Sequence, residues 1–341
     1  MLSTLFTACA ALLGAAAAAP AYHDGHIQTV FEFPNNSFVE NLAVRSNGEI
    51  LVTVLTSREL VLVDPRRPGH SVLVHNFTEA RGLTGIAEYE PDVFAVIAGD
   101  YHFKTTNWGA GTWTLWNVDL RGVKVHDGSL VPPPKVSKIK QVPESQLFDG
   151  MSLLSKKDKT LLIADTKAGV IYRVNAKTGD YQVVINSTYA SPLQTPHGVN
   201  GLHVRGDTLY FTNSGQFTMV KVPIHEDGTP AGPFTIAARP QRPLEVYDDF
   251  TLDCDGNMFI ATGAANTIVE ISPDGKRQDV LAGSLNSTDV AESTAATFGR
   301  GPFDKDVLYV TTAGGSAVPV NGDIIIPGKL LAIKTNSKGS C

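Results

Sequence analysis

The chain has 341 residues, of which 43% are hydrophobic, 8% aromatic and 18% charged, so it has enough apolar side chains for a large packed core. The formal net charge is −6 and no basic cluster stands out, which argues against nucleic acid or an anionic membrane as the main partner. The sequence contains no nucleophile elbow, phosphate-binding glycine loop, dinucleotide fingerprint or zinc-ligand spacing, and this argues against redox and phosphoryl-transfer chemistry.

Residues 1–21 predict a cleaved secretory signal peptide. Leu2 to Ala19 is an uncharged, alanine-rich run that is short for a membrane span, and small residues at Ala17, Ala19 and Ala21 suit a cleavage site. Only the amino terminus supplies positive charge to this segment. We therefore expect a secreted protein, or one in the lumen of the secretory pathway, with residues 22–341 as a single domain.

Sequons and cysteines are compatible with that compartment. Four Asn-x-Ser/Thr sequons predict glycosylation at Asn35, Asn76, Asn186 and Asn286. Cleavage removes Cys9 and leaves Cys254 and Cys341, which either form a disulfide or stay as two free thiols.

After the leader, a unit of about fifty residues occurs six times. Each copy opens with an apolar stretch, turns at Gly, Asp or Asn, and continues into a β-favouring stretch, and further strands flank turns such as Ser272-Pro-Asp-Gly. The last copy ends at residues 329–334 without room for a fourth strand, whereas residues 27–33 form an unassigned strand before the first copy. We predict an all-β fold, a six-bladed β-propeller with four-stranded blades, in which the N-terminal strand joins the last blade and closes the ring.

Propeller geometry brings the starts of the six copies together around one mouth of the central channel. The predicted ring consists of Glu40, Thr84, Asp149, Asn200, Asp248 and Thr294. Its carboxylates repel one another unless they are protonated or neutralised by a cation, and oxygen-only donors favour calcium or another hard divalent cation over zinc or copper. Alternatively, Asp149 and Asp248 only cap turns.

Three segments carry a family resemblance: Glu40-Asn-Leu-Ala-Val, His197-Gly-Val-Asn-Gly-Leu and Tyr247-Asp-Asp-Phe-Thr-Leu. They resemble blade openings of the regucalcin/gluconolactonase/luciferin-regenerating-enzyme superfamily of six-bladed propellers, and the resemblance covers essentially the whole mature chain. It implies that Glu40, Asn200 and Asp248 hold a divalent cation and that Asp149 is the general base of lactone hydrolysis. No organic cofactor is implied.

The chain departs from this pattern at three positions. Phe148 replaces a frequent substrate-binding Asn before the acidic residue. Asp249 replaces the glycine that usually follows the Asp ligand, and Asn41 follows Glu40.

Two long loops are predicted to overhang the ring. Residues 100–113 are aromatic and residues 313–328 are apolar, and such a cover favours a terpenoid or polyketide-like ligand over a sugar lactone. His197 lies near the ring and is either an acid or hydrogen-bond donor in catalysis, or a rim histidine bonded to the backbone. The candidate substrate contacts are Thr84, Tyr101, His102, Lys104, Trp108, Phe148, Asn213 and Thr294.

The alanine-rich leader and the run from Glu40 to Gly48 are similar to a secreted filamentous-fungal branch of this superfamily. That branch includes hetero-Diels-Alderases, which join a polyketide- or tropolone-derived quinone methide to a sesquiterpene. The resemblance implies a cycloaddition catalyst of specialised metabolism with small apolar substrates, and we expect Asp149, His197 and Asn200 to be its catalytic residues. Two alternatives stay open, a calcium-dependent lactonase and a secreted propeller that binds a ligand without catalysis.

Overall fold

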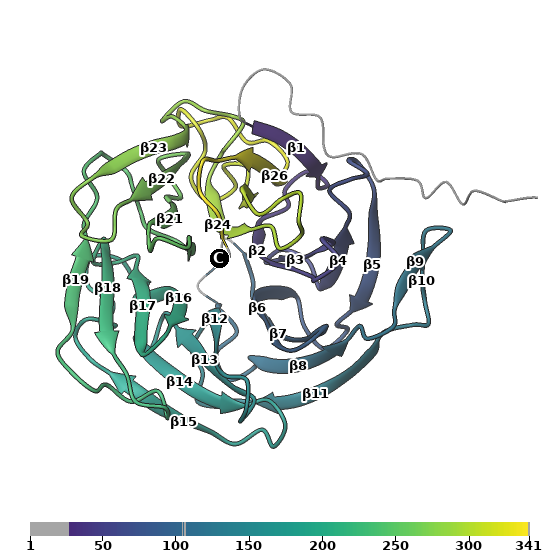
Figure 1. Cartoon of the computed structure of the whole chain (residues 1–341), viewed down its shortest axis with the longest axis horizontal. Coiled ribbons are helices and arrows are strands. Elements are labelled where there is room, and N and C mark those ends of the chain that lie inside the picture. Colours follow the sequence, from purple (N-terminus) through teal and green to yellow (C-terminus); the bar gives the residue numbers. More distant parts are fainter. Residues whose placement is uncertain (1–26, 104, 106, 340–341) are drawn as a thin grey trace, which may run out of the picture.

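The computed structural model describes residues 27–339, with the exception of residues 104 and 106. All regular secondary structure in this part of the chain is β-strand, and Figure 1 shows the strands as sheets arranged radially around a central axis. The predicted six-bladed β-propeller is confirmed. The predicted leader, Lys104 and Cys341 lie outside the described residues. Between residues 27 and 339, no helix is long and apolar enough to cross a membrane.

Each blade is an antiparallel sheet of four strands, and the strand that lies first in the repeat is nearest to the axis (Figure 1). A small hairpin of β9 (Lys124–His126) and β10 (Ser129–Val131) is inserted in blade two. From the axis outwards, the blades consist of β2 (Val39–Val44), β3 (Ile50–Val54), β4 (Glu59–Val63) and β5 (Ser71–Asn76) in blade one; β6 (Gly82–Glu90), β7 (Val93–Gly99), β8 (Thr114–Asp119) and β11 (Lys135–Gln141) in blade two; β12 (Phe148–Ser155), β13 (Thr160–Asp165), β14 (Val170–Asn175) and β15 (Tyr181–Asn186) in blade three; β16 (Val199–Arg205), β17 (Thr208–Asn213), β18 (Thr218–Pro223) and β19 (Thr235–Ala238) in blade four; β20 (Phe250–Leu252), β21 (Met258–Ala261), β22 (Thr267–Ile271) and β23 (Gln278–Gly283) in blade five; and β24 (Ser293–Phe298), β25 (Val307–Thr312), β26 (Lys329–Lys334) and β1 (Ile27–Glu32) in blade six.

The ring is closed as the repeats predict. β1 pairs antiparallel with β26, with Ile27 opposite Ile333 and Glu32 opposite Lys329. Because the first strand of the described chain completes the last blade, blades one and six are held together by a sheet rather than by packing alone.

The hydrophobic core lies between neighbouring blades. Leu162 and Ile171 of blade three pack with Leu209 and Phe211 of blade four, and all four side chains are fully buried. Burial of each such side chain contributes about 1.5–3 kcal/mol. This packing fixes the positions of the innermost strands, which carry the predicted ring.

A β-bulge occurs at the ring position in five blades. In blade one, Val39 pairs with Val54 and Leu42 with Val52, so Glu40 and Asn41 together oppose one residue, Thr53. Equivalent register shifts occur in blades two, three, four and six. A bulge re-aims the side chains of its extra residue, and here it changes which residues face the channel.

Glycine follows the ring residue in blades two, three and four. A Cβ on Gly150 would lie 2.5 Å from the carbonyl oxygen of Asn200, and one on Gly201 would lie 2.3 Å from Asp249 Oδ1. The absence of a side chain therefore lets neighbouring innermost strands approach closely at this end of the channel, which we call the acidic mouth.

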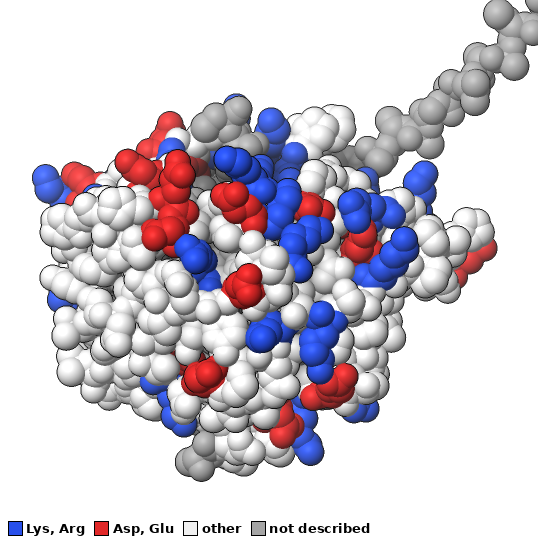
Figure 2. Space-filling view, turned by 90° about the horizontal axis from the view of Figure 1, so that it is seen from below, with Lys and Arg blue, Asp and Glu red and all other residues white. Residues whose placement is uncertain are grey.

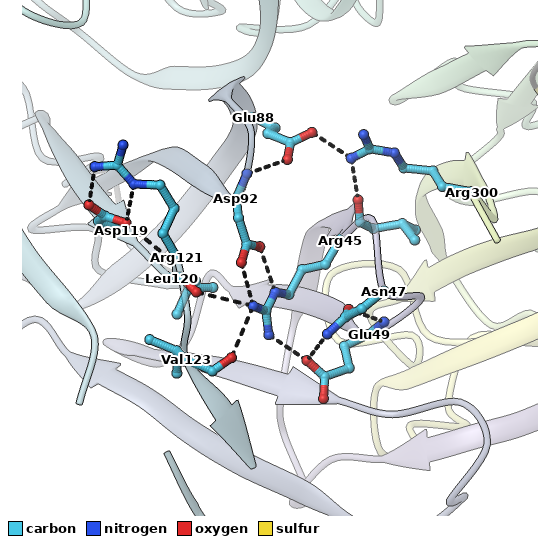
Figure 3. A network of polar contacts seen from close by, with 11 residues as sticks. Arg45, Asn47, Glu49, Glu88, Asp92, Asp119, Leu120, Arg121, Val123 and Arg300 are labelled. Atoms are coloured by element: carbon cyan, nitrogen blue, oxygen red, sulfur yellow. Dashed lines mark hydrogen bonds and ion pairs between the residues drawn. The ribbon is translucent and has the colours of Figure 1, made fainter. Parts of the chain in front are cut away.

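The innermost strands end at the opposite opening, the far mouth, where charges are paired. Figure 3 shows Arg45 between Asp92 and Glu49, with Arg300 joined to Glu88 beside them. Arg45 is only 2% exposed, and its Nη2 lies 2.7 Å from Asp92 Oδ2. In the edge-on view of Figure 2, charged side chains of both signs are densest along the upper edge, and the left flank is largely uncharged.

Candidate functional site

Three predicted ring carboxyl groups interact at the acidic mouth. The side chains of Glu40 and Asp149 lie within hydrogen-bonding reach of each other, and each affects the pKa of the other carboxyl. Asn200 lies beside Asp248, and its amide favours the charged form of that carboxyl. Glu40, Asp149 and Asn200 are each less than 10% exposed. The four residues come from four different blades, and the structure brings them together as the repeat alignment predicts.

Burial dominates the electrostatics of this cluster. It raises the pKa of Glu40 well above the ordinary value, and the charges of Asp149 and Asp248 raise it further. Burial also raises the pKa of Asp149 to about 6, although its bond to Glu40 opposes the change. The pKa of Asp248 is raised well above the ordinary value by burial and then by Asp149 and Asp249. The carboxyls of the acidic mouth therefore bind protons more tightly than exposed carboxyls do.

Asp249 is a fourth carboxyl group of the cluster and one of the departures from the family pattern. Its Oδ2 accepts a hydrogen bond of 2.8 Å from Asn41 Nδ2, and its Oδ1 accepts one of 2.7 Å from the backbone N–H of Phe250. His203 Nε2 lies 3.7 Å from Oδ1. The two departures thus bind each other across the channel. Alignment of the residue after each ring position could have paired them, because blades two to four have glycine there.

One oxygen atom of the cluster has no protein partner. Glu40 Oε2 is buried and accepts or donates no hydrogen bond within the described chain. By contrast, Asn200 Nδ2 donates to Ser214 Oγ at 3.1 Å, and Ser214 Oγ donates to the carbonyl of Tyr247 at 2.8 Å. Leaving a buried oxygen unpaired costs about 1–3 kcal/mol, so Glu40 is suited to a group that binds during function.

The donor set fits a hard divalent cation in its chemistry. Glu40, Asn200 and Asp248 offer only oxygen ligands, and a cation would relieve the repulsion that raises the carboxyl pKa values. Among the described residues, no group of three or more His, Cys, Asp and Glu side chains is arranged to hold a metal ion. The calcium site therefore stays a prediction.

The aromatic loop of blade two lies beside the acidic mouth. Burial raises the pKa of Tyr101 to about 12, and the charges of Asp149 and Glu40 contribute, so its hydroxyl lies near this pair. The Phe103 ring lies 6.5 Å from that of Tyr101 and 5.6 Å from that of Phe38, which precedes β2. The cover therefore reaches blade one.

The same loop also reaches blades three and four. The ring of Trp108 stacks on His197 with 5.0 Å between centroids and 14° between planes, and Lys167 Nζ lies 5.0 Å from the Trp108 centroid. Burial lowers the pKa of His197, so its imidazole is neutral at neutral pH. We name Phe38, Tyr101, Phe103, Trp108 and His197 the aromatic roof.

Two predicted substrate contacts, Thr84 and Thr294, have a different role. Thr84 Oγ1 donates to the carbonyl of Phe148 at 2.9 Å, and Thr294 Oγ1 donates to that of Val39 at 2.7 Å. Each hydroxyl joins its blade to the next, and both side chains are almost fully buried. The prediction that they contact a substrate is therefore corrected.

Phe148 and Asn213 are corrected in the same way. Phe148 is fully buried and packs edge-on against Tyr172, with 5.3 Å between centroids, because consecutive strand residues point to opposite sides and Asp149 points to the channel. Asn213 is fully buried, and its Nδ2 donates to the carbonyls of Tyr189 and Ser191, both at 2.9 Å.

The remaining predicted residues have mixed positions. His102 is 32% exposed and its Nε2 lies 3.5 Å from Asp100 Oδ2, so it lies at the edge of the aromatic roof.

Among the predicted sequons, Asn35, Asn186 and Asn286 are exposed, and Asn76 is partly buried. Cys254 is disulfide-bonded, which excludes the free-thiol alternative for it. Its predicted partner, Cys341, lies outside the described residues.

Comparison with known proteins agrees with the fold and the resemblance. Residues 163–314 match the family model of the SMP-30/Gluconolactonase/LRE-like region. A "Putative hetero-Diels-Alderase" from Phoma sp is 28% identical, over 82% of this chain and 84% of that protein. A protein of the same description from Sarocladium schorii is 27% identical, over 90% of this chain and 83% of that protein.

Solved structures share the propeller fold. A luciferin-regenerating enzyme has a TM-score of 0.65 at 14% identity, over 92% of this chain and 96% of that one. Regucalcin from Agrobacterium tumefaciens, described as a calcium-binding protein, has a TM-score of 0.57 at 17% identity, over 92% and 97%. At these identities the likeness shows the fold alone.

Proposed function

We propose that this protein is an enzyme that catalyses a hetero-Diels-Alder cycloaddition at the acidic mouth. Its substrates would be a polyketide- or tropolone-derived quinone methide and a sesquiterpene alkene. The similarity to two proteins described as hetero-Diels-Alderases supports the reaction class. The observation that carries the proposal is the buried Glu40–Asp149 pair, whose pKa values are raised and which has an unpaired oxygen beside the aromatic roof.

The reaction needs no nucleophile from the protein. One C–C and one C–O bond form together as the π bonds of the heterodiene and alkene are consumed, and no net proton is transferred. A protonated carboxyl can donate a hydrogen bond to the carbonyl oxygen of the quinone methide, which withdraws electrons from the heterodiene and stabilises the charge that develops there. We assign this role to the Glu40–Asp149 pair.

Other groups would orient the substrates and exclude water. Asn200 is held by its hydrogen bond to Ser214, so its amide is preorganised at the same site. The neutral imidazole of His197 stacks on the ring of Trp108 and helps to hold it in place. A closed aromatic cover would hold two apolar partners close together and keep water from quenching the quinone methide.

The direct test is incubation of the purified protein with a quinone-methide precursor and a cyclic sesquiterpene. We expect a faster reaction with one dominant stereoisomer, and loss of both effects in Glu40→Gln. Asp255→Asn, at an exposed turn of blade five, is the matched control and should behave as the parent protein. A rate and stereochemistry equal to those of the uncatalysed reaction would overturn the proposal.

A calcium-dependent lactonase is the second candidate, supported by the family-model match and by the oxygen-only donor set. Glu40, Asn200 and Asp248 would hold the ion, which when bound would polarise the lactone carbonyl. Asp149, with a pKa of about 6, is mostly ionised above pH 7 and can accept the proton of a water molecule. Lactone turnover that survives both chelation and Asp149→Asn would exclude this candidate. Ligand binding without turnover of either substrate class would instead identify a non-catalytic binding protein.

We also propose that the protein acts outside the cytosol, because residues 1–21 have the composition of a secretory leader. Expression of the full chain in a fungal host, followed by assay of the medium, tests this. Retention of the uncleaved chain in the cytosol would contradict it.

A further inference from the structure

A cavity of about 1050 Å³ lies between blades one and two, away from the channel axis. Tyr101, His102 and Phe103 form one of its walls, so it lies next to the aromatic roof. None of the ring carboxylates borders it. The reaction proposed for the acidic mouth therefore does not involve this cavity.

The lining is polar and carries charges of both signs. Arg58 and Arg81 line the cavity together with Glu59, Glu79 and Asp100. Arg81 Nε lies 2.7 Å from Asp100 Oδ1, so part of this charge is already paired. A cavity with both signs of charge does not select an anion or a cation, and its planar polar groups suit a neutral ligand with many hydroxyls.

An aromatic surface completes the lining. The Trp116 ring borders the cavity, and the ring of Phe77 packs against it edge-on at 5.5 Å. Sugars commonly combine hydrogen bonds to planar polar side chains with contact to an aromatic ring, because their C–H faces are apolar. This lining therefore matches carbohydrate.

The predicted sequon Asn76-Phe77-Thr78 lies in this cavity. Asn76 ends β5, and both Asn76 and Thr78 line the cavity, whereas Phe77 between them is buried in the core. Alternation along the chain thus presents the acceptor amide and the hydroxyl of the sequon to the same space.

The amide of Asn76 lacks partners. Its Oδ1 is buried without a hydrogen bond, and its Nδ2, the atom that a glycan would occupy, donates to no side chain or carbonyl of the described chain. The other three sequon asparagines are exposed. Asn76 is therefore distinguished by a built polar cavity around its side chain.

We propose that Asn76 carries an N-linked oligosaccharide whose first sugars occupy this cavity. In the transfer, Asn76 Nδ2 forms a bond to the anomeric carbon of an oligosaccharide linked to a lipid diphosphate. The bond between that carbon and the phosphate oxygen breaks, the lipid diphosphate leaves, and Nδ2 loses one proton. The transfer precedes folding, because the folded chain partly buries Asn76. The inference rests on the predicted secretory leader and is independent of the reaction at the acidic mouth.

The test is production of the full chain in a eukaryotic secretory host, with site occupancy measured by peptide mass spectrometry. We expect a glycan on Asn76 that a glycosidase removes from the folded protein about tenfold more slowly than the glycan on Asn186, because the folded cavity protects it. After unfolding, both should be released at the same rate. Asn186→Gln is the matched control for stability.

Two variants separate the glycan from the amide. Asn76→Gln and Thr78→Ala both abolish the sequon, and each should lower the melting temperature of the secreted protein more than Asn186→Gln does. An Asn76 that stays unmodified, whether or not the other sequons are occupied, would overturn the proposal. Equal release rates from folded Asn76 and Asn186 would also overturn it.

Discussion

The two mouths of the channel handle buried charge in opposite ways. At the far mouth, the buried guanidinium of Arg45 is bonded to Asp92 and Glu49 and to two backbone carbonyls. At the acidic mouth, the pKa of Glu40 is raised most by burial and then by the neighbouring acids Asp149 and Asp248. Glu40 lies near the start of β2 and Arg45 directly follows its end, so the fold places both kinds of arrangement within one blade.

This difference indicates that the acidic mouth is not built for stability. A fold that pairs its buried charges at one end could do so at the other, and burying unpaired carboxyls lowers stability. The comparison predicts that removal of a charged group lowers the free energy of unfolding at the far mouth. At the acidic mouth, the same kind of change should leave that free energy equal or raise it.

The largest effect is expected at the far mouth. Arg45→Met leaves Asp92 and Glu49 without their cation, and breaking a buried ion pair from one side costs about 3–5 kcal/mol. The free energy of unfolding in urea measures this loss. Arg121→Met, whose 59% exposed side chain pairs with Asp119, is the control and should change stability little. A similar small change for Arg45→Met would show that this network is not structural.

At the acidic mouth the corresponding change should affect the reaction and spare the fold. Glu40→Gln removes a donor aimed at developing charge, so we expect the cycloaddition rate to fall about 10²–10³-fold. The free energy of unfolding should stay equal or rise, because a repelling carboxyl is removed. Loss of stability with unchanged turnover would contradict this prediction, because it would give Glu40 a structural role like that of Arg45.

The pH dependence of stability sharpens the contrast. The pKa of Asp149 is raised by burial from 3.8 to about 6, so the folded chain binds its proton more tightly than the unfolded chain does. The stability from this group is present in full below pH 3.8 and is lost as the pH rises to about 6, by about 3 kcal/mol. Unfolding midpoints measured between pH 3.5 and 7 should show this decline, and Asp149→Asn should reduce it. An unchanged slope in the variant would assign the decline to other groups.

A cation should reverse that loss if the acidic mouth binds one. At pH 7, calcium at about a hundred times its dissociation constant should raise stability by about 2.7 kcal/mol. Asp248→Asn should remove this gain, whereas Asp92→Asn at the far mouth should keep it. Calcium without effect on either the melting temperature or turnover would leave the protonated pair as the working form of the site.

Much of the acidic mouth follows from periodicity alone. A repeat of about fifty residues puts equivalent positions at the same end of the channel, and so Glu40, Asp149, Asn200 and Asp248 could be predicted as neighbours. The same repeat places the aromatic loop at this end of blade two and leaves the N-terminal strand to complete blade six.

The errors come from a shift of one residue. Five innermost strands are bulged at the ring, which alters the faces of adjacent side chains without a clear sign in composition. Asn41 lies in the bulge of blade one and was therefore missed, and with it its partner Asp249 in the unbulged blade five. Phe148 was assigned to the pocket although it packs in the core. The hydroxyls of Thr84 and Thr294 were misassigned because hydrogen bonds between blades depend on how closely the strands approach.

The smallest expected effect concerns the aromatic roof, which tests whether the acidic mouth must be closed. Trp108→Leu removes the stack on His197, and an aromatic pair contributes about 0.5–1.5 kcal/mol beyond the area that it buries. If the roof excludes water, the variant should release more water-quenched quinone methide per cycloadduct while Glu40 and Asp149 stay intact. Trp116→Leu, away from the channel beside the blade-one and blade-two cavity, is the control and should leave that ratio unchanged. Equal product ratios in the parent protein and Trp108→Leu would mean that the carboxyl pair acts without a closed cover, and that the contrast between the two mouths rests on charge alone.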